Sequence, residues 1–390
     1  MPTRIVANRA DLAKALAALK VVTVANSPIP ILKHVLITPE PGRIALRVTD
    51  QDVDVRITCP AEVAGCQAET CPVLELSNLV GSLPDGAQVE LTIGDKGRMA
   101  VRAGRVKASL PTLPPAEFPQ IRPEGTEVIR FEMPAAVLFR LMTLPATAIS
   151  TEATRYYLNG IYLHPMPDLK PDPVMRAVST DGHRMIRIEE PMPAEAAGMP
   201  GIIVPRNTRK LIAERIADAE DTVAVAVSAT SIAVTHGDWS ITSKLIDGTF
   251  PEYERNIPLE FSRVVSTGKA ELAQMLRRAA GLAEEQKTSK LLALDIMVDG
   301  IRLWSNRADG ASIEDELDAL LKGTPITIGF NSRYLLDALS VLDSENVEIR
   351  MNAPDQPAML ARADGKDLSR LVIVMPMHVG KPPAAVQKAG

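Results

Sequence analysis

The sequence predicts an α+β protein made of three copies of one domain, each with two helices packed on antiparallel sheets. Three observations support this fold class. Two kinds of amphipathic helix recur along the 390 residues, the second followed each time by a strand with strict alternation; one turn recurs, and so does a Phe-Pro pair that ends at Pro119 and at Pro251. All of them share a period of roughly 130 residues. Because four independent features share one period, we interpret the chain as a threefold repeat.

The first recurring helix is "DLAKALAALKVV", which begins at Asp11. Its apolar residues stand at i, i+3, i+4 and i+7 and therefore form one helical face: Leu12, Ala15, Leu16 and Leu19. The same pattern returns in "AAVLFRLM" from Ala135 and in "AELAQMLRRAAGLAE" from Ala270. We expect one such helix in each copy.

The second recurring helix is followed each time by a strand. The helices are "LSNLVGSL", "NTRKLIAERI" and "NSRYLLDALSVL", with matching leucines at Leu79, Leu211 and Leu335. In the strands that follow, apolar residues alternate with other residues, which is the pattern of a half-buried strand. These strands contain Val89, Val223 and Val347.

The recurring turn is "VTDQD", "STDGH" and "WSNRADG", with Asp50, Asp181 and Asn306 at the shared position. Aspartate and asparagine favour turns because their side chains bond to nearby backbone N–H groups. An alternative interpretation makes Asp181 and His183 an acid–base pair of an enzyme. No nucleophile motif, glycine-rich phosphate loop or metal-ligand set accompanies the pair, so we favour the turn.

The repeat sets the domain boundaries that we expect. They are residues 1–122, 129–253 and 259–379, followed by a Pro/Ala/Gly-rich tail at 380–390 that we expect to be disordered. A tandem array of binding modules without special geometry would have the same period and stays an alternative.

Composition excludes several classes of protein. The chain is 46% hydrophobic with a formal net charge of −5, so any nucleic-acid surface must be a local basic patch. Cys59, Cys66 and Cys71 lack metal-ligand spacing and a nearby histidine, which favours free thiols and no metal. The N-terminus lacks the apolar run of a signal peptide, and no stretch is long enough to span a bilayer. We expect a cytoplasmic protein.

Five stretches occur in an order and spacing that resemble one family: "LPTLPPAEFP", "RYYLNGIYL", "VSTDGHRMIRI", "SKLIDGTFPEYERNIP" and "VIVMPM". Together they resemble the bacterial DNA sliding clamps, the beta subunits of DNA polymerase III, over residues 1 to about 379. The resemblance implies a head-to-tail homodimer whose six domains form a ring around duplex DNA. It implies a processivity factor for DNA replication without catalytic activity or cofactor. A DNA-binding protein that docks from one side is the competing function.

The resemblance also implies that basic residues of the repeat helices face the DNA. The candidates are Lys14, Lys20, Arg140, Arg206, Arg209, Lys210, Arg277, Arg278 and Arg333, and the loop residues Arg155, Tyr156 and Tyr157. Contacts that let DNA slide should go to phosphates rather than to base edges. The plainer alternatives are solvated helix faces and a tyrosine pair packed at a strand edge. The loop "VANSPIPILKHV" lacks a basic residue that relatives often carry before "PIL", so we expect no DNA contact there.

A groove for short linear motifs of partner proteins is the second implied site. Its partners would be the catalytic subunit of DNA polymerase III, the clamp loader, and other polymerases and repair proteins. The matching residues are Leu158, Thr180, Gly182, His183, Arg184, Met185, Pro251, Asn256, Pro357, Ile373, Val374, Met375, Pro376, Met377 and His378. Asn256 and His378 depart from the aliphatic residue and the arginine usual in the family. The alternative is ordinary inter-domain core.

Two or three buried anchor side chains would contribute about 2 kcal/mol each. Because ordering the flexible peptide costs part of this free energy, we expect micromolar affinity in this groove. The dimer seam is predicted from the "GRVKASLPTL" stretch and one leucine of the third copy: Arg105, Lys107, Ala108, Leu110 and Leu282. Glu284 and Glu285 are the acidic residues that Arg105 and Lys107 could meet.

Overall fold

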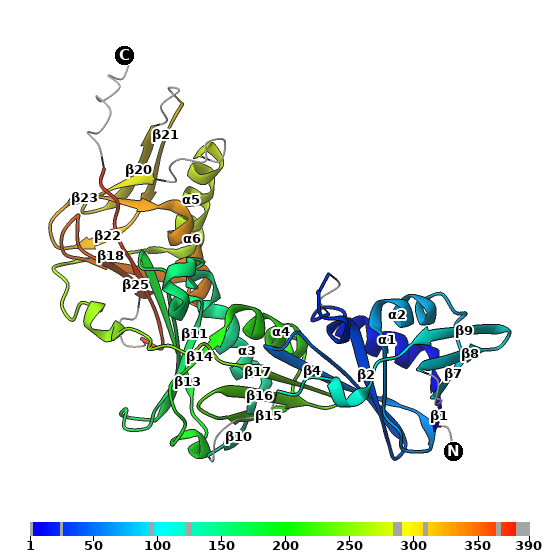
Figure 1. Cartoon of the computed structure of the whole chain (residues 1–390). Helices are drawn as coiled ribbons and strands as arrows, with labels where there is room; N and C mark the ends of the chain where they lie inside the picture. The colour runs from blue at the N-terminus through cyan, green and yellow to red at the C-terminus, as the bar shows by residue number, and fades with distance from the viewer. Residues whose placement is uncertain are drawn as a thin grey trace. The chain divides into compact units, whose positions relative to one another are not determined.

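The computed structural model describes residues 3–23, 26–93, 97–121, 127–283, 291–306, 311–363 and 368–379. Figure 1 shows the fold of the chain, coloured along its length. The chain divides into two compact units. The first unit comprises Met1–Ala136, Pro193–Pro200 and Glu214–Leu245, and the second comprises Val137–Met192, Gly201–Ala213 and Ile246–Gly390. Each unit is described by itself below.

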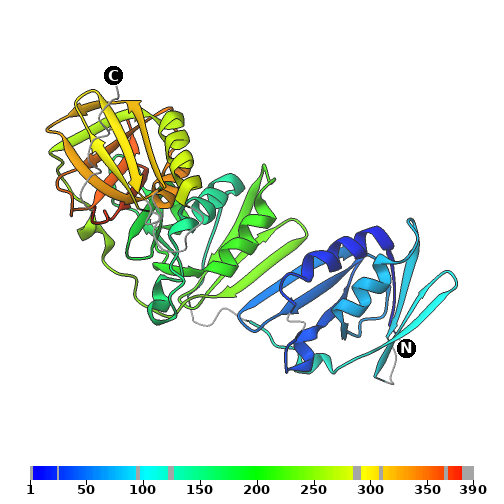
Figure 2. The same cartoon turned by 90° about the horizontal axis from the view of Figure 1, so that it is seen from above.

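The six predicted helices are confirmed. They are α1 (Arg9–Leu19), α2 (Val73–Gly81), α3 (Ala135–Thr143), α4 (Arg206–Ile216), α5 (Lys269–Ala283) and α6 (Ser332–Val341). The pairs α1 with α2 and α5 with α6 pack together, as Figures 1 and 2 both show. Side-chain caps explain two of the starts, because Asn8 accepts a hydrogen bond from the N–H of Ala10 and Asn331 from that of Arg333.

Each repeat has a first sheet in which the strand before one helix pairs with the strand after the other. In the first repeat the order is β5 (Glu62–Ala64), β1 (Thr3–Asn8), β7 (Gln88–Ile93), β8 (Arg98–Ala103) and β9 (Val106–Pro111). In the second it is β10 (Ile129–Pro134), β15 (Thr222–Val227), β16 (Ser231–His236) and β17 (Trp239–Lys244). In the third it is β22 (Leu320–Lys322), β18 (Arg263–Gly268), β24 (Asn346–Met351), β25 (Ala358–Arg362) and β26 (Arg370–Val374). The three predicted alternating strands are therefore β7, β15 and β24.

The second sheet of each repeat has the same order three times. It is β6 (Glu69–Pro72), β2 (His34–Glu40), β3 (Arg43–Thr49) and β4 (Val53–Pro60) in the first repeat. It is β14 (Ile202–Pro205), β11 (Gly160–Met166), β12 (Val174–Thr180) and β13 (Arg184–Pro191) in the second. In the third it is β23 (Ile326–Asn331), β19 (Leu291–Ile296), β20 (Gly300–Asn306) and β21 (Ser312–Asp318). The chain thus has three copies of one two-sheet α+β architecture.

Successive repeats join through the end strands of these sheets. In the first unit β4 pairs antiparallel with β17, which makes an eight-stranded sheet. In the second unit β13 pairs antiparallel with β26, which makes a nine-stranded sheet. The strands β9 and β21 hold the equivalent end positions but are the last strands of their own sheets. The compact units therefore follow shared sheets rather than whole repeats.

Every second side chain of β7, β15 and β24 is buried, and these buried side chains form the apolar sheet faces that the helices cover. Val89, Leu91 and Ile93 of β7 are completely buried, and so are Leu12 and Leu16 of α1. The alternation seen in the sequence is therefore the alternation between core and solvent. No helix of the described ranges is long and apolar enough to cross a membrane.

The recurring turn has the same hydrogen bonds in the first two repeats. Oδ1 of Asp50 accepts from the N–H groups of Asp52 and Val53, at 3.0 and 2.7 Å. Oδ1 of Asp181 accepts from those of His183 and Arg184, at 2.9 and 3.0 Å. The prediction that Asp181 forms a turn is confirmed. Asn306 ends β20, and the residues after it lie outside the described ranges.

Candidate functional site

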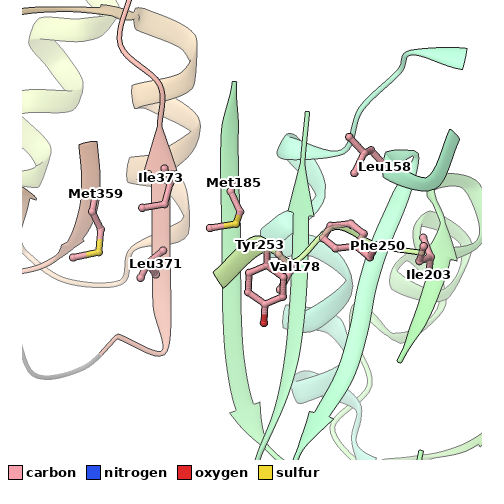
Figure 3. Close-up of a cluster of buried hydrophobic side chains, with 9 residues drawn as sticks. All are labelled: Leu158, Val178, Met185, Ile203, Phe250, Tyr253, Met359, Leu371 and Ile373. Carbon is pink, nitrogen blue, oxygen red and sulfur yellow. The ribbon is translucent and has the colours of Figure 1, made fainter. Parts of the chain in front are cut away.

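One face of the nine-stranded sheet carries a cluster of buried apolar side chains (Figure 3). The cluster comprises Leu158, Val178, Met185, Ile203, Phe250, Tyr253, Met359, Leu371 and Ile373. It spans the joint between β13 and β26, because Met185 of β13 lies directly opposite Ile373 of β26. Residues opposite one another in antiparallel strands share a face, which is why segments almost 200 residues apart form one surface.

Three of the residues that the sequence predicted for a groove meet in this cluster: Leu158, Met185 and Ile373. Val374 is completely buried and follows Ile373 in the strand, so its side chain lies on the opposite face of the sheet. Pro251, Asn256 and His378 are exposed, and Pro357 and Thr180 are half-buried. The structure thus places three predicted residues on a buried floor and several others at an exposed or half-buried rim, whereas Val374 lies on the other face of the sheet.

The Met-Pro-Met segment is fixed by its backbone and exposes its side chains. The N–H of Met375 donates to the carbonyl of His183, and that of Met377 donates to the carbonyl of Gly329, both at 2.8 Å. Met375 is 37% exposed and Met377 36%. A hollow of about 380 Å³ adjoins the segment and is lined by Thr327, Gly329, Pro354, Asp355, Pro376, Met377, His378 and Val379. Two adaptable thioethers therefore face solvent at a pre-formed position.

Arg184 holds the turn beside the floor. Its Nε donates to Asp181 at 3.1 Å, while other guanidinium nitrogens donate to Asp337 and to the carbonyl of Thr147. The guanidinium also lies over the ring of Tyr334. Because the side chain is buried and its donors are engaged, Arg184 supports the wall rather than offering free donors to a ligand.

Gly182 lies where a side chain would collide with its neighbour. Its φ is +88°, and a Cβ there would lie 2.7 Å from Nη1 of Arg155. Glycine is suited to this position for both reasons. His183 next to it is exposed, so its imidazole is available to a ligand at the rim.

An aromatic and charged region at one end of the floor was not predicted from the sequence. The ring of Tyr162 stacks on Phe250 with centroids 4.8 Å apart, and Nε2 of His164 lies 2.9 Å from the hydroxyl of Tyr253. Burial lowers the pKa of His164. Nε of Arg176 donates to Glu189 at 2.7 Å. The signal available in the sequence was the alternation in "RMIRIEE", which puts Met185, Arg187 and Glu189 on one face.

Asp181 and His183 do not form an acid–base pair. One carboxylate oxygen of Asp181 accepts two backbone N–H groups and the other accepts from Arg184, so the group is engaged in the turn. Among the residues that the structure describes, no group of three or more His, Cys, Asp or Glu side chains could hold a metal ion. Cys59 and Cys71 are buried free thiols and Cys66 is an exposed one; burial raises the pKa of Cys59 to about 11.

The loop predicted to lie near DNA is held by an internal ion pair. Both Nε and Nη2 of Arg155 donate to the carboxylate of Glu152 at 2.7 Å. Tyr156 is 52% exposed, and its ring meets that of Tyr157 edge-on with centroids 5.8 Å apart. Tyr156 therefore offers a ring face to a ligand, whereas Tyr157 is half-buried.

The predicted helical cations fall into two groups. The exposed group is Lys14, Lys210, Arg277, Arg278 and Arg333. Within it, Arg278 forms an ion pair with Asp315. The half-buried group is Lys20, Arg140, Arg206 and Arg209. Arg140 is paired with Glu190, Arg206 donates to the carbonyls of Ile149 and Ser150, and Lys20 donates to Asn78. The first group is better placed to meet a phosphate.

The predicted seam residues lie at the outer end of a sheet. Arg105 and Lys107 are exposed, and Ala108 and Leu110 are half-buried in or next to β9. Leu282 lies in α5, although its side chain is not among those described, and Glu284 and Glu285 fall outside the described residues. The structure adds an acidic end strand that sequence reasoning missed, since β21 reads "SIEDELD".

Family models match the chain in three consecutive segments. These are the N-terminal domain of the DNA polymerase III beta subunit over residues 3–122, its central domain over 132–252 and its C-terminal domain over 254–378. The beta sliding clamp of Caulobacter vibrioides is 34% identical over 378 residues, which cover 95% of this chain and 98% of the relative. The beta sliding clamp of Escherichia coli K12 is 30% identical over 355 residues, or 90% and 93% of the two chains.

Solved structures agree with these matches. A crystal structure of the Caulobacter crescentus beta sliding clamp superimposes with a TM-score of 0.91 at 33% identity, covering 97% of this chain and all of that one. A sliding clamp from Bartonella birtlesii, bound to griselimycin, has a TM-score of 0.88 at 33% identity with the same coverage.

Proposed function

The chain belongs to the DNA polymerase III beta subunit family, the beta sliding clamps, and on that premise we propose that two copies close head to tail into a ring around duplex DNA. Its function is that of a non-catalytic processivity factor. The main support for the proposal is the strand pairing that joins successive repeats, because it occurs twice in the same form within the chain.

The same joint is made twice within the chain. An end strand of one second sheet pairs with an end strand of the next first sheet, as β4 with β17 and as β13 with β26. The remaining strands in these two positions are β21 and β9. Pairing β21 of one copy with β9 of another would make the same joint a third time. Such a heterologous contact makes a ring when the rotations close.

Charge supports this pairing. The β9 side carries the exposed Arg105 and Lys107, while β21 carries four acidic residues: Glu314, Asp315, Glu316 and Asp318. Opposite charges across two end strands favour the correct partner and oppose pairing of like edges. Ala108, Leu110 and Leu282 would supply the apolar part of the seam.

Sequence-independent contact with phosphates would come first from the exposed helical cations. Arg155 and Arg278 would be weaker candidates, because they are already paired with Glu152 and Asp315. Lys14, Lys210, Arg277 and Arg333 are the first candidates, and Tyr156 would stack on an exposed base. Arg140 and Arg206 are weaker candidates because their guanidinium groups already have partners. Arg209 and Lys20 are also weaker candidates, since they are half-buried.

The apolar cluster and its rim would bind short motifs of polymerases, the clamp loader and repair proteins. The floor would be formed by Leu158, Met185 and Ile373, and the rim by His183, Pro251, Met375 and Met377. We expect the motifs to bind there with micromolar affinity. Griselimycin, which is bound to the Bartonella clamp, is the competitor that we expect to displace such peptides.

The three clamp domains would span residues 1–122, 129–253 and 259–379, with 380–390 as a tail. We place the protein in the cytoplasm, with the DNA that it would encircle.

Topological retention tests the ring. The clamp is loaded onto nicked circular DNA by a clamp loader, isolated with the circle, and the circle is then cut once. A ring slides off the ends, so the bound clamp should fall to background. Retention after cutting would contradict the ring and favour a protein that docks on one side. A circle that is incubated without the nuclease is the control for spontaneous release.

A further inference from the structure

One row of side chains across the groove floor contains a charged member. The register across four neighbouring strands and the joint puts five residues in line on one face: Ile203, Tyr162, Val178, Arg187 and Leu371. Four of them belong to the apolar cluster or pack against it. Arg187 is the exception, and it is only 8% exposed.

Arg187 is incompletely paired. Its Nη2 donates to the carbonyl of Leu368 at 3.0 Å and lies 3.4 Å from Oε1 of Glu189. Its Nε is buried without a hydrogen-bond partner. A buried donor left without a partner costs stability, and native proteins rarely contain one without a reason. Burial also lowers the pKa of Arg187.

The neighbouring Arg176 shows that the missing partner is not a general feature of this region. Nε of Arg176 donates to Glu189 at 2.7 Å, and its Nη1 donates to the Tyr253 hydroxyl and to Glu254. Glu189 therefore accepts chiefly from Arg176, and Nε of Arg187 is left without an acceptor.

Arg187 lies between an apolar row and a charged row of the same sheet face. The row on one side of it is Thr180, Met185, Ile373 and Met359, and the row on the other side contains His164, Arg176 and Glu189. Figure 3 shows Val178 and Leu371 on the two strands that flank the strand of Met185. Arg187 thus lies at the border between the apolar floor and the charged end, next to the place where apolar anchors would sit.

We propose that Arg187 is a specificity-determining residue of the groove, and that its Nε donates to the carboxylate of an Asp or Glu side chain that neighbours the apolar anchors of a bound peptide. The inference rests on the proposed function of this groove. A carboxylate is the matching acceptor because a charge-assisted bond to guanidinium is stronger than a neutral one. An acidic side chain rather than the peptide backbone would be the partner, because Arg187 is only 8% exposed and its Nε is buried.

The test is a selection from a twelve-residue peptide library displayed on phage. It is carried out on the wild-type clamp, on Arg187→Met and on Arg302→Met, whose side chain lies in another sheet on β20. We expect wild type and Arg302→Met to enrich peptides with Asp or Glu beside two apolar residues. Arg187→Met should enrich apolar residues at that place. The same frequencies with wild type and Arg187→Met would overturn the inference.

The most enriched acidic peptide then gives a quantitative measure. Amidated at its C-terminus and titrated by calorimetry, it should bind the wild-type clamp about tenfold more tightly than its Asp→Asn version. The difference should vanish in Arg187→Met, and Arg187→Lys should keep part of it. A purely structural arginine would change the melting temperature but not this ratio, and that outcome would also overturn the inference.

The experiment distinguishes a failure of the role assigned to Arg187 from a failure of the peptide groove itself. If the library yields peptides that griselimycin displaces but that show no acidic preference, only the role of Arg187 is wrong. If neither wild type nor the variants enrich any peptide that griselimycin displaces, the groove itself is wrong, and the inference about Arg187 falls with it.

Discussion

The guanidinium of Arg184 lies 4.3 Å from the centroid of the Tyr334 ring. Arg184 begins β13 in the second repeat and Tyr334 lies in α6 in the third, so the contact links the two repeats beside their shared sheet. Cation–π attraction adds to the ion pairs of Arg184 with Asp181 and Asp337. Neither Tyr334 nor Asp337 could be identified as a partner from the sequence alone, because both lie about 150 residues from Arg184.

Replacing Arg184 should destabilise the second unit. Arg184→Met leaves Asp337 and the Thr147 carbonyl without their donor, and breaking a buried pair costs about 3 kcal/mol. The free energy of unfolding from urea titration measures the loss. Tyr334→Phe keeps the ring and is the matched control, expected within about 0.5 kcal/mol of wild type. Equal stability of Arg184→Met and Tyr334→Phe would contradict the supporting role.

The shared turn provides a comparison between repeats. Gly182 and Gln51 hold the same position, with φ of +88° and +79°. Gly182→Ala puts a methyl group against Arg155 and should cost about 1–2 kcal/mol and weaken peptide binding. Gln51→Gly relieves a positive φ and should be neutral or stabilising by up to about 1 kcal/mol. Urea midpoints and peptide titrations of both variants check this opposite sign.

The exposed methionines should contribute to peptide binding without supporting the fold. Met375→Ala combined with Met377→Ala removes apolar area worth about 1–2 kcal/mol in a complex, so peptide affinity should fall by about fivefold to thirtyfold. The melting temperature should not change. Met297→Ala removes a similarly exposed methionine of the same unit and is the control. Unchanged affinity in the double variant would remove the rim from the groove.

Charge reversal should open the proposed ring. Arg105→Glu with Lys107→Glu places negative charge opposite β21, so sedimentation equilibrium should show monomers of 42.0 kDa at concentrations where wild type is dimeric. Adding Glu314→Lys and Glu316→Lys should restore the dimer. Raising the salt concentration should weaken the wild-type dimer, since exposed charges are screened. A reversed variant that stays dimeric would contradict the pairing of β9 with β21.

Stability should fall on mild acidification. Burial lowers the pKa values of His164 and His34, so the unfolded chain takes up these protons at higher pH than the folded chain. The contribution is complete above the unfolded value of about 6.5 and is lost as pH falls toward the folded values. Urea midpoints at pH 7.5 and 5.5 measure the loss. His164→Gln should reduce it, and His164→Gln with His34→Gln should reduce it further; an unchanged pH dependence in both variants would contradict the assignment.

Local patterns predicted much of the fold. Helical periodicity identified α1 to α6, strict alternation identified β7, β15 and β24, and the aspartate of the turn was placed correctly, because these features depend on neighbours within a few residues. The joints of β4 with β17 and of β13 with β26 were not predicted, since strand partners far apart in sequence leave no local signal. Tyr334 was missed for that reason, although its helix α6 was predicted. Arg187 was missed together with its strand β13, which local patterns did not predict.

The joints between end strands determine where a deviation in sheet twist has its effect. In a closed assembly of two chains, any change of twist at β4–β17 or β13–β26 occurs once in each copy, and the sum reaches the two contacts between copies. Those contacts have no covalent connection, so the mismatch appears there as a gap or an offset. A substitution inside a single chain, far from β9 and β21, can therefore control whether the closed form or an open chain of subunits is the lower in free energy.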